Sequence, residues 1–143
     1  MTGHIATAET DIDAPANRVW EALTDPDEIA KYMFGSRVDT DWQPGSSITW
    51  KGEYEGKPFE DKGEILEVVR DRRLKMTHYS PLSGEEDVPE NYHTLTYELE
   101  SAGPVTRVAL SQDNNPTAEA AEHSKANWEK MLSGLKEVVE TSE

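Results

Sequence analysis

The chain has 143 residues, of which 14 are basic and 29 acidic, so its formal net charge at pH 7 is -15. Nucleic acids and anionic membrane surfaces repel such a charge, which argues against either as a partner. The chain has no cysteine, and this excludes disulfides, thiolate metal sites and cysteine nucleophiles. No apolar run reaches membrane-spanning length and no signal peptide is evident, so we expect a cytoplasmic protein without membrane insertion. The length suits one domain over residues 1–143, and the acid excess indicates either simple solubility or a saline cytoplasm.

The first residues predict a strand followed by two short helices. Residues 4–12 alternate weakly between apolar and polar side chains, which predicts the strand. Apolar residues at helical spacing after Pro15 predict an amphipathic helix of two or three turns. A second helix is predicted to begin at Asp25, with Glu28 three residues later closing a capping box, and to end at Gly35.

From Arg37 onward the pattern alternates with a period of two between turn residues, as is typical of an antiparallel meander. Gly63 indicates a bulge or bend in it, and residues 80–90, with two prolines and a glycine, predict an exposed loop. Residues 117–141 repeat their apolar positions at three- and four-residue steps, which predicts a long amphipathic helix capped by Thr117. The predicted strands of the meander are 38–43, 47–54, 59–69, 74–79, 92–100 and 105–112.

Short motifs near both ends of the chain form a recognisable set. They are Ala14-Pro15, Val19-Trp20, the Ala-Leu-Thr-Asp-Pro run at 22–26, Pro44-Gly45, and Asn127-Trp128 followed by Leu132, Leu135 and Lys136.

With these motifs the chain resembles the activator-of-Hsp90-ATPase-homologue-like (AHSA1-like) family of the START/Bet v 1 superfamily, often called SRPBCC domains. The resemblance covers essentially the whole chain. It implies an α+β helix-grip fold, in which a curved antiparallel sheet wraps around the C-terminal helix and leaves an apolar cavity between them. Relatives with this fold bind lipids, sterols or polyketides, a few cyclise or dehydrate polyketides, and the eukaryotic namesake helps to stimulate the Hsp90 ATPase.

Strand alternation and the stripe of the last helix place one set of side chains around the interior. A mostly apolar and aromatic lining with a few polar groups is typical of a ligand cavity. The alternative is a packed core, which is favoured most at Leu132. The set comprises Trp50, Tyr54, Met76, His78, His93, Leu95, Tyr97, Trp128, Met131 and Leu132.

His78 and His93 are the members of this set that can titrate near neutral pH, so acid/base catalysis would begin with them, and Tyr97 is a third candidate. No carboxylate clearly joins them, and no spacing suggests a Ser-His-Asp triad. No third ligand shares their parity, so we predict neither a metal site nor a cofactor. A register shift of one residue would turn both histidines outward and bring Thr77 and Tyr79 inside.

Three functional hypotheses follow. The first is a binding module that holds a small hydrophobic or aromatic molecule between the curved sheet and the C-terminal helix. The second is a polyketide cyclase-like or dehydratase-like enzyme that uses the same cavity, and the third is a co-chaperone or protein-interaction module with a chaperone as its partner. Because no acid/base pair can be assembled from the sequence, binding is favoured over catalysis. Monomer and homodimer both stay open.

Overall fold

The computed structural model describes residues 3–33, 36–54, 56–80 and 86–141, and the side chain of Tyr54 lies outside this described part. Its elements are β1 (His4–Ile12), α1 (Ala16–Thr24), α2 (Pro26–Tyr32), β2 (Arg37–Asp39), β3 (Ser47–Tyr54), β4 (Lys57–Val69), β5 (Arg73–His78), the 3-10 helix η2 (Pro89–Asn91), β6 (His93–Ala102), β7 (Val105–Asn115) and α3 (Ala118–Thr141).

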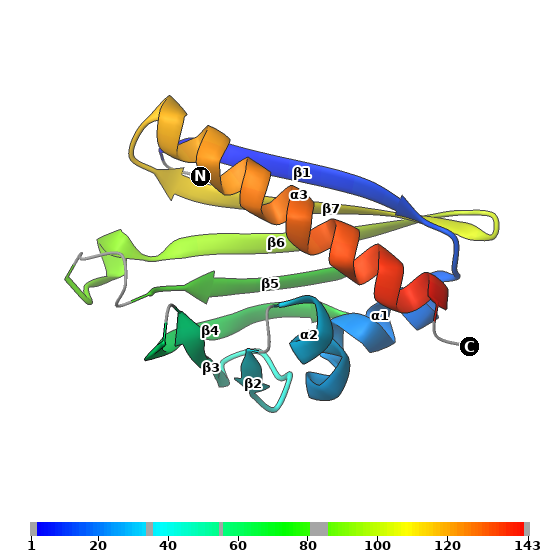
Figure 1. Cartoon of the computed structure of the whole chain (residues 1–143), viewed down its shortest axis with the longest axis horizontal. Coiled ribbons are helices and arrows are strands. Elements are labelled where there is room, and N and C mark those ends of the chain that lie inside the picture. The colour runs from blue at the N-terminus through cyan, green and yellow to red at the C-terminus, as the bar shows by residue number, and fades with distance from the viewer. Residues whose placement is uncertain (1–2, 34–35, 55, 81–85, 142–143) are drawn as a thin grey trace.

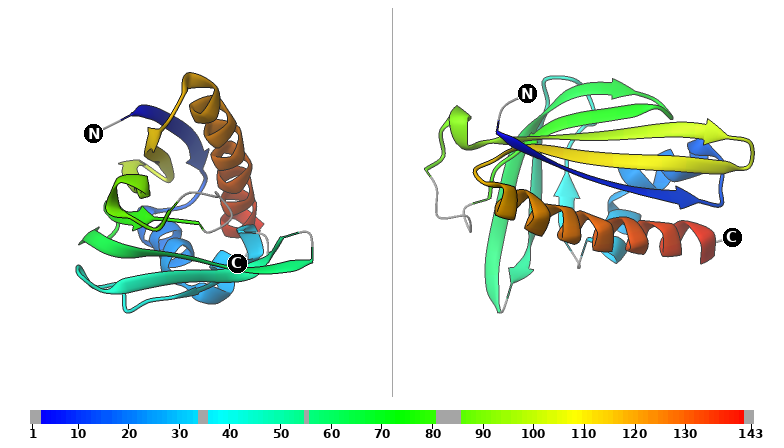
Figure 2. Two further views of the ribbon diagram at one scale, coloured as in Figure 1. Left: turned by 90° about the vertical axis from the view of Figure 1, so that its left-hand side faces the viewer. Right: turned by 90° about the horizontal axis from the view of Figure 1, so that it is seen from above.

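The strands form one antiparallel sheet in the order β1-β7-β6-β5-β4-β3-β2, and α3 lies alongside β1 and β7 (Figure 1). The sheet is strongly curved, because β3 and β4 run across the direction shared by β1, β7 and α3 (Figure 2). The short helices α1 and α2 follow the first strand. This arrangement is the helix-grip fold, so the predicted fold class is confirmed.

Gly63 of β4 allows two strands to approach unusually closely. A Cβ atom at this position would lie 1.8 Å from the carbonyl oxygen of Thr77 on β5, so a larger residue would force the backbones apart. The shift in β4–β5 pairing falls slightly later, between Ile65 and Glu67. The irregularity predicted at Gly63 is therefore a close backbone approach, followed by a shifted register.

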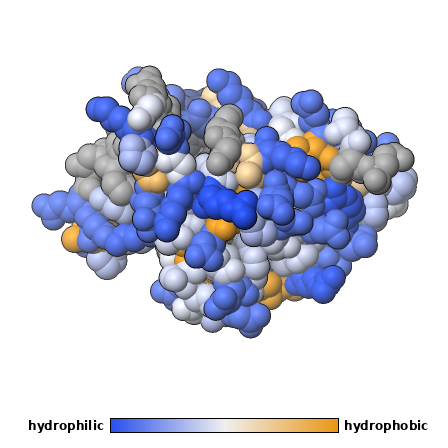
Figure 3. Space-filling model, turned by 60° about the horizontal axis from the view of Figure 1, so that its bottom comes forward, coloured by the Kyte–Doolittle hydropathy of each residue, from blue (hydrophilic) through white to orange (hydrophobic). Residues whose placement is uncertain are grey.

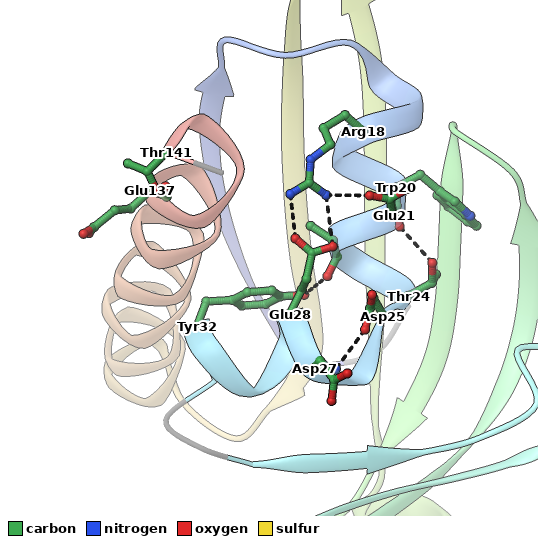
Figure 4. Close-up of polar contacts among 11 residues, drawn as sticks. Arg18, Trp20, Glu21, Thr24, Asp25, Asp27, Glu28, Tyr32, Glu137 and Thr141 are labelled. Atoms are coloured by element: carbon green, nitrogen blue, oxygen red, sulfur yellow. Dashed lines mark hydrogen bonds and ion pairs between the residues drawn. The ribbon is translucent and has the colours of Figure 1, made fainter. Parts of the chain in front are cut away.

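The α1–α2 corner is held together partly as predicted and partly by a different contact. Asp25 caps α2, since its side chain accepts a hydrogen bond from the backbone N–H of Asp27 at 2.9 Å. Glu28 was expected to close a capping box, but its carboxylate accepts hydrogen bonds from Arg18 of α1 at 2.6 Å and 3.0 Å. Figure 4 shows the Arg18 guanidinium between Glu28 and Glu21. A charge-assisted contact of this kind is stronger than a single backbone hydrogen bond, and it raises the pKa of Arg18.

Several predicted boundaries differ from those of the structure, by one or two residues for β4, β5 and β6 and by more for β2 and β7. The strand predicted over 38–43 is wrong in length, because β2 ends at Asp39 and Trp42 has a left-handed backbone with φ 58°. The last strand extends beyond residue 112, because Asn115 pairs with His4 at the start of β1. Helix α2 ends at Tyr32, and its predicted end at Gly35 lies outside the described residues. The predicted loop at 80–90 is described only in part, and η2 begins at its end.

Helix α3 is buried over only part of its length. Thr117 caps it as predicted, since its hydroxyl accepts a hydrogen bond from the N–H of Ala120 at 3.0 Å. None of residues 118–130 is buried, whereas the second half of the helix supplies several of the most deeply buried side chains of the core. These are Met131, Leu132, Leu135 and Val139, each at most 3% exposed.

The outer surface agrees with the acid-rich composition. The face turned forward in Figure 3 is mostly hydrophilic, and its hydrophobic patches are small and separate. Within the described residues, none of the helices combines the length and the apolar character needed to cross a membrane.

Candidate ligand-binding site

A cavity of about 600 Å³ lies between the sheet and the first part of α3. This volume is typical of pockets that hold small molecules. Its wall combines aromatic and aliphatic side chains from several strands with those of the helix. The wall includes Trp50 of β3, His78 of β5, Leu95 and Tyr97 of β6, and Trp128 and Met131 of α3.

The remaining predicted interior residues lie elsewhere. Met76 is 3% exposed and borders a void of about 20 Å³ in the core, which is too small for an organic ligand. Leu132 is 1% exposed and belongs to the packed core, the alternative that the sequence favoured there. The predicted contribution of Tyr54 concerns a side chain outside the described part of the chain.

The register of the sheet is the one that the sequence predicted. Met76 pairs with Leu95, and His78 pairs with His93 across β5 and β6, so both histidines start from the concave face. Thr77 instead accepts a hydrogen bond through its hydroxyl from the N–H of Glu64 at 2.9 Å. The alternative register, shifted by one residue, is therefore not the one observed in β5 and β6.

His78 is held by a carboxylate that sequence reasoning missed. Its Nε2 lies 2.9 Å from Oδ2 of Asp61, and its ring meets the ring of Trp50 edge-on with centroids 5.0 Å apart. The side chains of His78 and Asp61 are only 20% and 15% exposed. The expectation that no carboxylate joins the histidines is wrong. The signal available in the sequence was that Asp61 shares strand parity with Phe59 and Ile65. In the structure it lies opposite Trp50 in the β3–β4 pairing.

His93 lies in a different environment from His78. Its Nδ1 donates a hydrogen bond to the backbone carbonyl of Asp113 at 2.9 Å, because a carbonyl can only accept. The ring borders a shallow depression beside the start of α3, together with His123, and is not part of the wall of the 600 Å³ cavity. The structure therefore assigns the two histidines to separate environments, although their backbones are paired.

A chain of polar contacts links the exposed half of α3 to the sheet. The indole Nε1 of Trp128 donates to Oε1 of Gln112 at 2.6 Å. Asn115, which is 2% exposed, accepts from the hydroxyl of Ser124 at 3.0 Å and donates to the carbonyl of His4 at 3.0 Å. These contacts hold the helix at one side of the cavity. Sequence reasoning missed them, because it treated 113–115 as a connection rather than as strand.

The ionisation of Tyr97 limits the acid/base chemistry that the cavity wall can perform. Burial raises the pKa of Tyr97, so its phenol stays protonated at neutral pH and does not act readily as a base. The acid/base group that the geometry does assemble is the His78–Asp61 pair. No cluster of three or more potential metal-ligating side chains is found in the part of the chain that the structure describes.

Comparisons with known proteins agree with the fold. Residues 13–140 match the family model of activator of Hsp90 ATPase homolog 1-like proteins. No curated protein matches the chain. Among solved structures, ChR145 from Cytophaga hutchinsonii is 47% identical, with 98% of this chain and 96% of that chain covered and a TM-score of 0.85.

Two more distant structures share the fold alone. The Aha1 dimer from Colwellia psychrerythraea is 19% identical, with 96% of this chain and 97% of that chain covered and a TM-score of 0.75. CalU16 from Micromonospora echinospora is also 19% identical, with 99% of this chain and 88% of that chain covered and a TM-score of 0.72.

Proposed function

Because the chain belongs to the family of activator of Hsp90 ATPase homolog 1-like proteins and has a cavity beneath α3, we propose that it binds a small apolar or aromatic molecule there. The observation that carries the proposal is the lining of this cavity. Trp50, Tyr97 and Trp128 border a space of about 600 Å³ that no described side chain fills. Aromatic walls gain free energy when they exchange contact with water for contact with an apolar ligand.

The packing around the cavity supports a preformed site. Trp50 and Tyr97 are 6% exposed, so their positions are fixed by neighbours on the sheet rather than by a ligand. Trp128 is fixed by its hydrogen bond to Gln112. Since these walls are already ordered, binding costs little side-chain entropy.

Native mass spectrometry of freshly purified protein tests the proposal most simply. We expect a fraction of the protein to carry a small-molecule adduct, which organic extraction removes. The extracted protein should then bind methylnaphthalene with saturation and with a change in tryptophan fluorescence, because Trp50 and Trp128 line the cavity. An extracted protein that binds no apolar probe up to the solubility limit would contradict the proposal.

Catalysis is a second candidate, and the His78–Asp61 contact is the specific observation in its favour. A carboxylate that accepts a hydrogen bond from one imidazole nitrogen orients the ring and leaves the other nitrogen to move a proton. If the protein is a cyclase-like or dehydratase-like enzyme, His78→Gln should lower turnover of an identified substrate about 10²- to 10⁴-fold while binding stays nearly intact. His93→Gln is the matched control, because His93 is bound to the Asp113 carbonyl outside the cavity.

A co-chaperone role has weaker support. It draws on the family description alone, since the large apolar residues exposed on the described surface do not form one patch. Ile5 lies on β1, and three strands separate it in the sheet from Leu66 and Val69 of β4.

A further inference from the structure

The cavity wall contains one carboxylate that is largely removed from water. Asp61 is 15% exposed in its side chain, and its Oδ2 is 2.9 Å from Nε2 of His78. Its Oδ1 is buried and accepts no hydrogen bond from any residue that the structure describes. Most buried carboxylate oxygens have a donor, so this oxygen is an exception that calls for a physical explanation.

The charge of the wall indicates which donor would fit. A neutral His78 that donates Nε2–H to Asp61 leaves the pair with one negative charge. The other charged residues of the wall, Glu53 and Lys130, are both exposed at its rim and carry opposite charges. Tyr97 is a neutral phenol. With His78 neutral, the interior of the cavity carries the negative charge of Asp61, within a chain whose formal net charge is -15.

The aromatic residues of the same wall favour the same kind of ligand. Trp50, Tyr97 and Trp128 line the cavity with Asp61, and Trp50 also touches the His78 ring. Aromatic rings attract organic cations that lie over their faces within about 6 Å of the ring centroid, and tryptophan does so most strongly. A carboxylate beside several aromatic rings can thus recognise an apolar molecule with a positively charged end.

We propose that the cavity selects apolar molecules that carry a protonated amine, and that Asp61 accepts a hydrogen bond from the ammonium group. This inference rests on the proposed binding function and names the class of its ligand. Asp61 lines the cavity, and the last torsion of an aspartate has a broad energy well, so a small rotation would let its carboxylate meet an ammonium group there. A carboxylic acid, such as a fatty acid, is disfavoured because its charge would face the charge of Asp61.

Four probes with one ring system test the proposal: methylnaphthalene, naphthylmethanol, naphthylmethylamine and naphthylacetate, all substituted at the same ring position. Calorimetric titrations at about pH 8 keep the amine largely protonated. We expect the amine to bind about 10- to 100-fold more tightly than methylnaphthalene, because hydrogen bonds to charged groups contribute that much. The alcohol should fall between them, and the acetate should bind most weakly.

Two variants of neighbouring residues then locate the effect. Asp61→Asn removes the charge in the cavity wall, so the preference for the amine over methylnaphthalene should fall below about threefold. Glu60→Gln is the matched control. Glu60 is exposed and adjacent to Asp61 on β4, so its side chain points to the opposite face, and the same loss of charge there should leave the preference unchanged.

The possible results separate this inference from the binding function. If no probe binds the wild-type protein, the proposed function itself fails. If methylnaphthalene binds but the amine binds no more tightly, or if the acetate binds best, the inference is overturned and the binding function stands. An amine preference that survives Asp61→Asn, or that Glu60→Gln reduces equally, overturns the role of Asp61. Should Asp61→Asn not fold, the order of the four probes on the wild-type protein still decides.

Discussion

From Met131 to Val139, helix α3 inserts its apolar side chains into the core, whereas none of its residues from Ala118 to Lys130 is buried. The packed half is also tied down by polar contacts. Lys136 Nζ donates to the carbonyl of Asp11 at 2.7 Å, and the N–H of Asp13 donates to Glu140 at 2.8 Å. The open half contacts the sheet through the Trp128–Gln112 hydrogen bond and borders the cavity.

The two halves show that one amphipathic pattern can serve two purposes. The apolar stripe of α3 runs through both halves, and its period predicts which face turns inward. It does not predict how far the sheet lies from that face. Where the sheet approaches, a residue such as Leu135 stabilises the fold; where the sheet curves away, Trp128 becomes a wall of the cavity.

The packed half should give the largest loss of stability on substitution. Leu135 is 0% exposed, so Leu135→Ala leaves a void and should lower the free energy of unfolding by about 2–5 kcal/mol. Urea denaturation followed by circular dichroism measures this change. A loss below about 1 kcal/mol would place this part of α3 outside the core and remove the contrast between the halves.

In the open half, a larger deletion should cost less. Trp128→Ala removes a whole indole, which would cost roughly 3–5 kcal/mol in a packed core, but Trp128 is only partly buried and borders an empty space. We therefore expect a loss below about 3 kcal/mol, together with at least a tenfold loss of affinity for methylnaphthalene. If stability falls as far as in a packed core and affinity does not change, Trp128 belongs to the core and not to a binding site.

A smaller change isolates the polar tie between α3 and β7. Trp128→Phe keeps an aromatic ring in the cavity wall but deletes the Nε1–H that Gln112 accepts. Gln112 is 7% exposed, so its unpaired oxygen should cost about 1 kcal/mol of stability. Affinity for an apolar probe should fall less than in Trp128→Ala. Because both variants lack the Nε1–H, an equal fall in the two would show that the hydrogen bond matters more than the ring.

The smallest effect on stability at neutral pH comes from the ionisation of two buried tyrosines, one near the packed half of α3 and one in the cavity wall. Burial raises the pKa of Tyr32, which packs near α3, and of Tyr97 in the cavity wall above the ordinary value near 10. A raised folded-state pKa means that the stabilisation is fully present below about pH 10 and is lost as pH rises, because the unfolded chain then releases these protons first.

Stability should therefore decline as pH rises above about 10, with no effect of either phenol near pH 7. Urea denaturation across this range measures the decline, and Tyr97→Phe should make it shallower. An unchanged slope in this variant would show that Tyr97 reaches water and ionises normally in the folded protein.

Much of the fold could be predicted from local patterns. The bounds of β1 and β3 agree with the predicted ranges 4–12 and 47–54, since alternation and turn residues are properties of the sequence itself. The capping of α3 by Thr117 follows equally from local chemistry. The resemblance of the chain to its family supplied the remaining step, the wrapping of the sheet around the helix.

The polar features of the site could not be predicted, because they join residues from separate elements. Asp61 meets His78 only through the pairing of β4 with β5, and the strand pattern does not specify which polar residue turns inward. Glu28 had two possible partners, and its choice of Arg18 depends on how α1 and α2 meet. The depth of each α3 residue depends likewise on the curvature of the sheet.

The central claim is that the open half of α3, together with Met131 at the junction of the two halves, covers a binding cavity, while the rest of the packed half belongs to the core. Two-dimensional NMR of the extracted protein during titration with methylnaphthalene tests it most directly. We predict saturable shifts of the indole signals of Trp50 and Trp128, with the signals of Trp20 in α1 and of the Leu135 methyl groups unchanged. Shifts centred on Leu135, or no saturable shift at Trp50 and Trp128, would contradict the account.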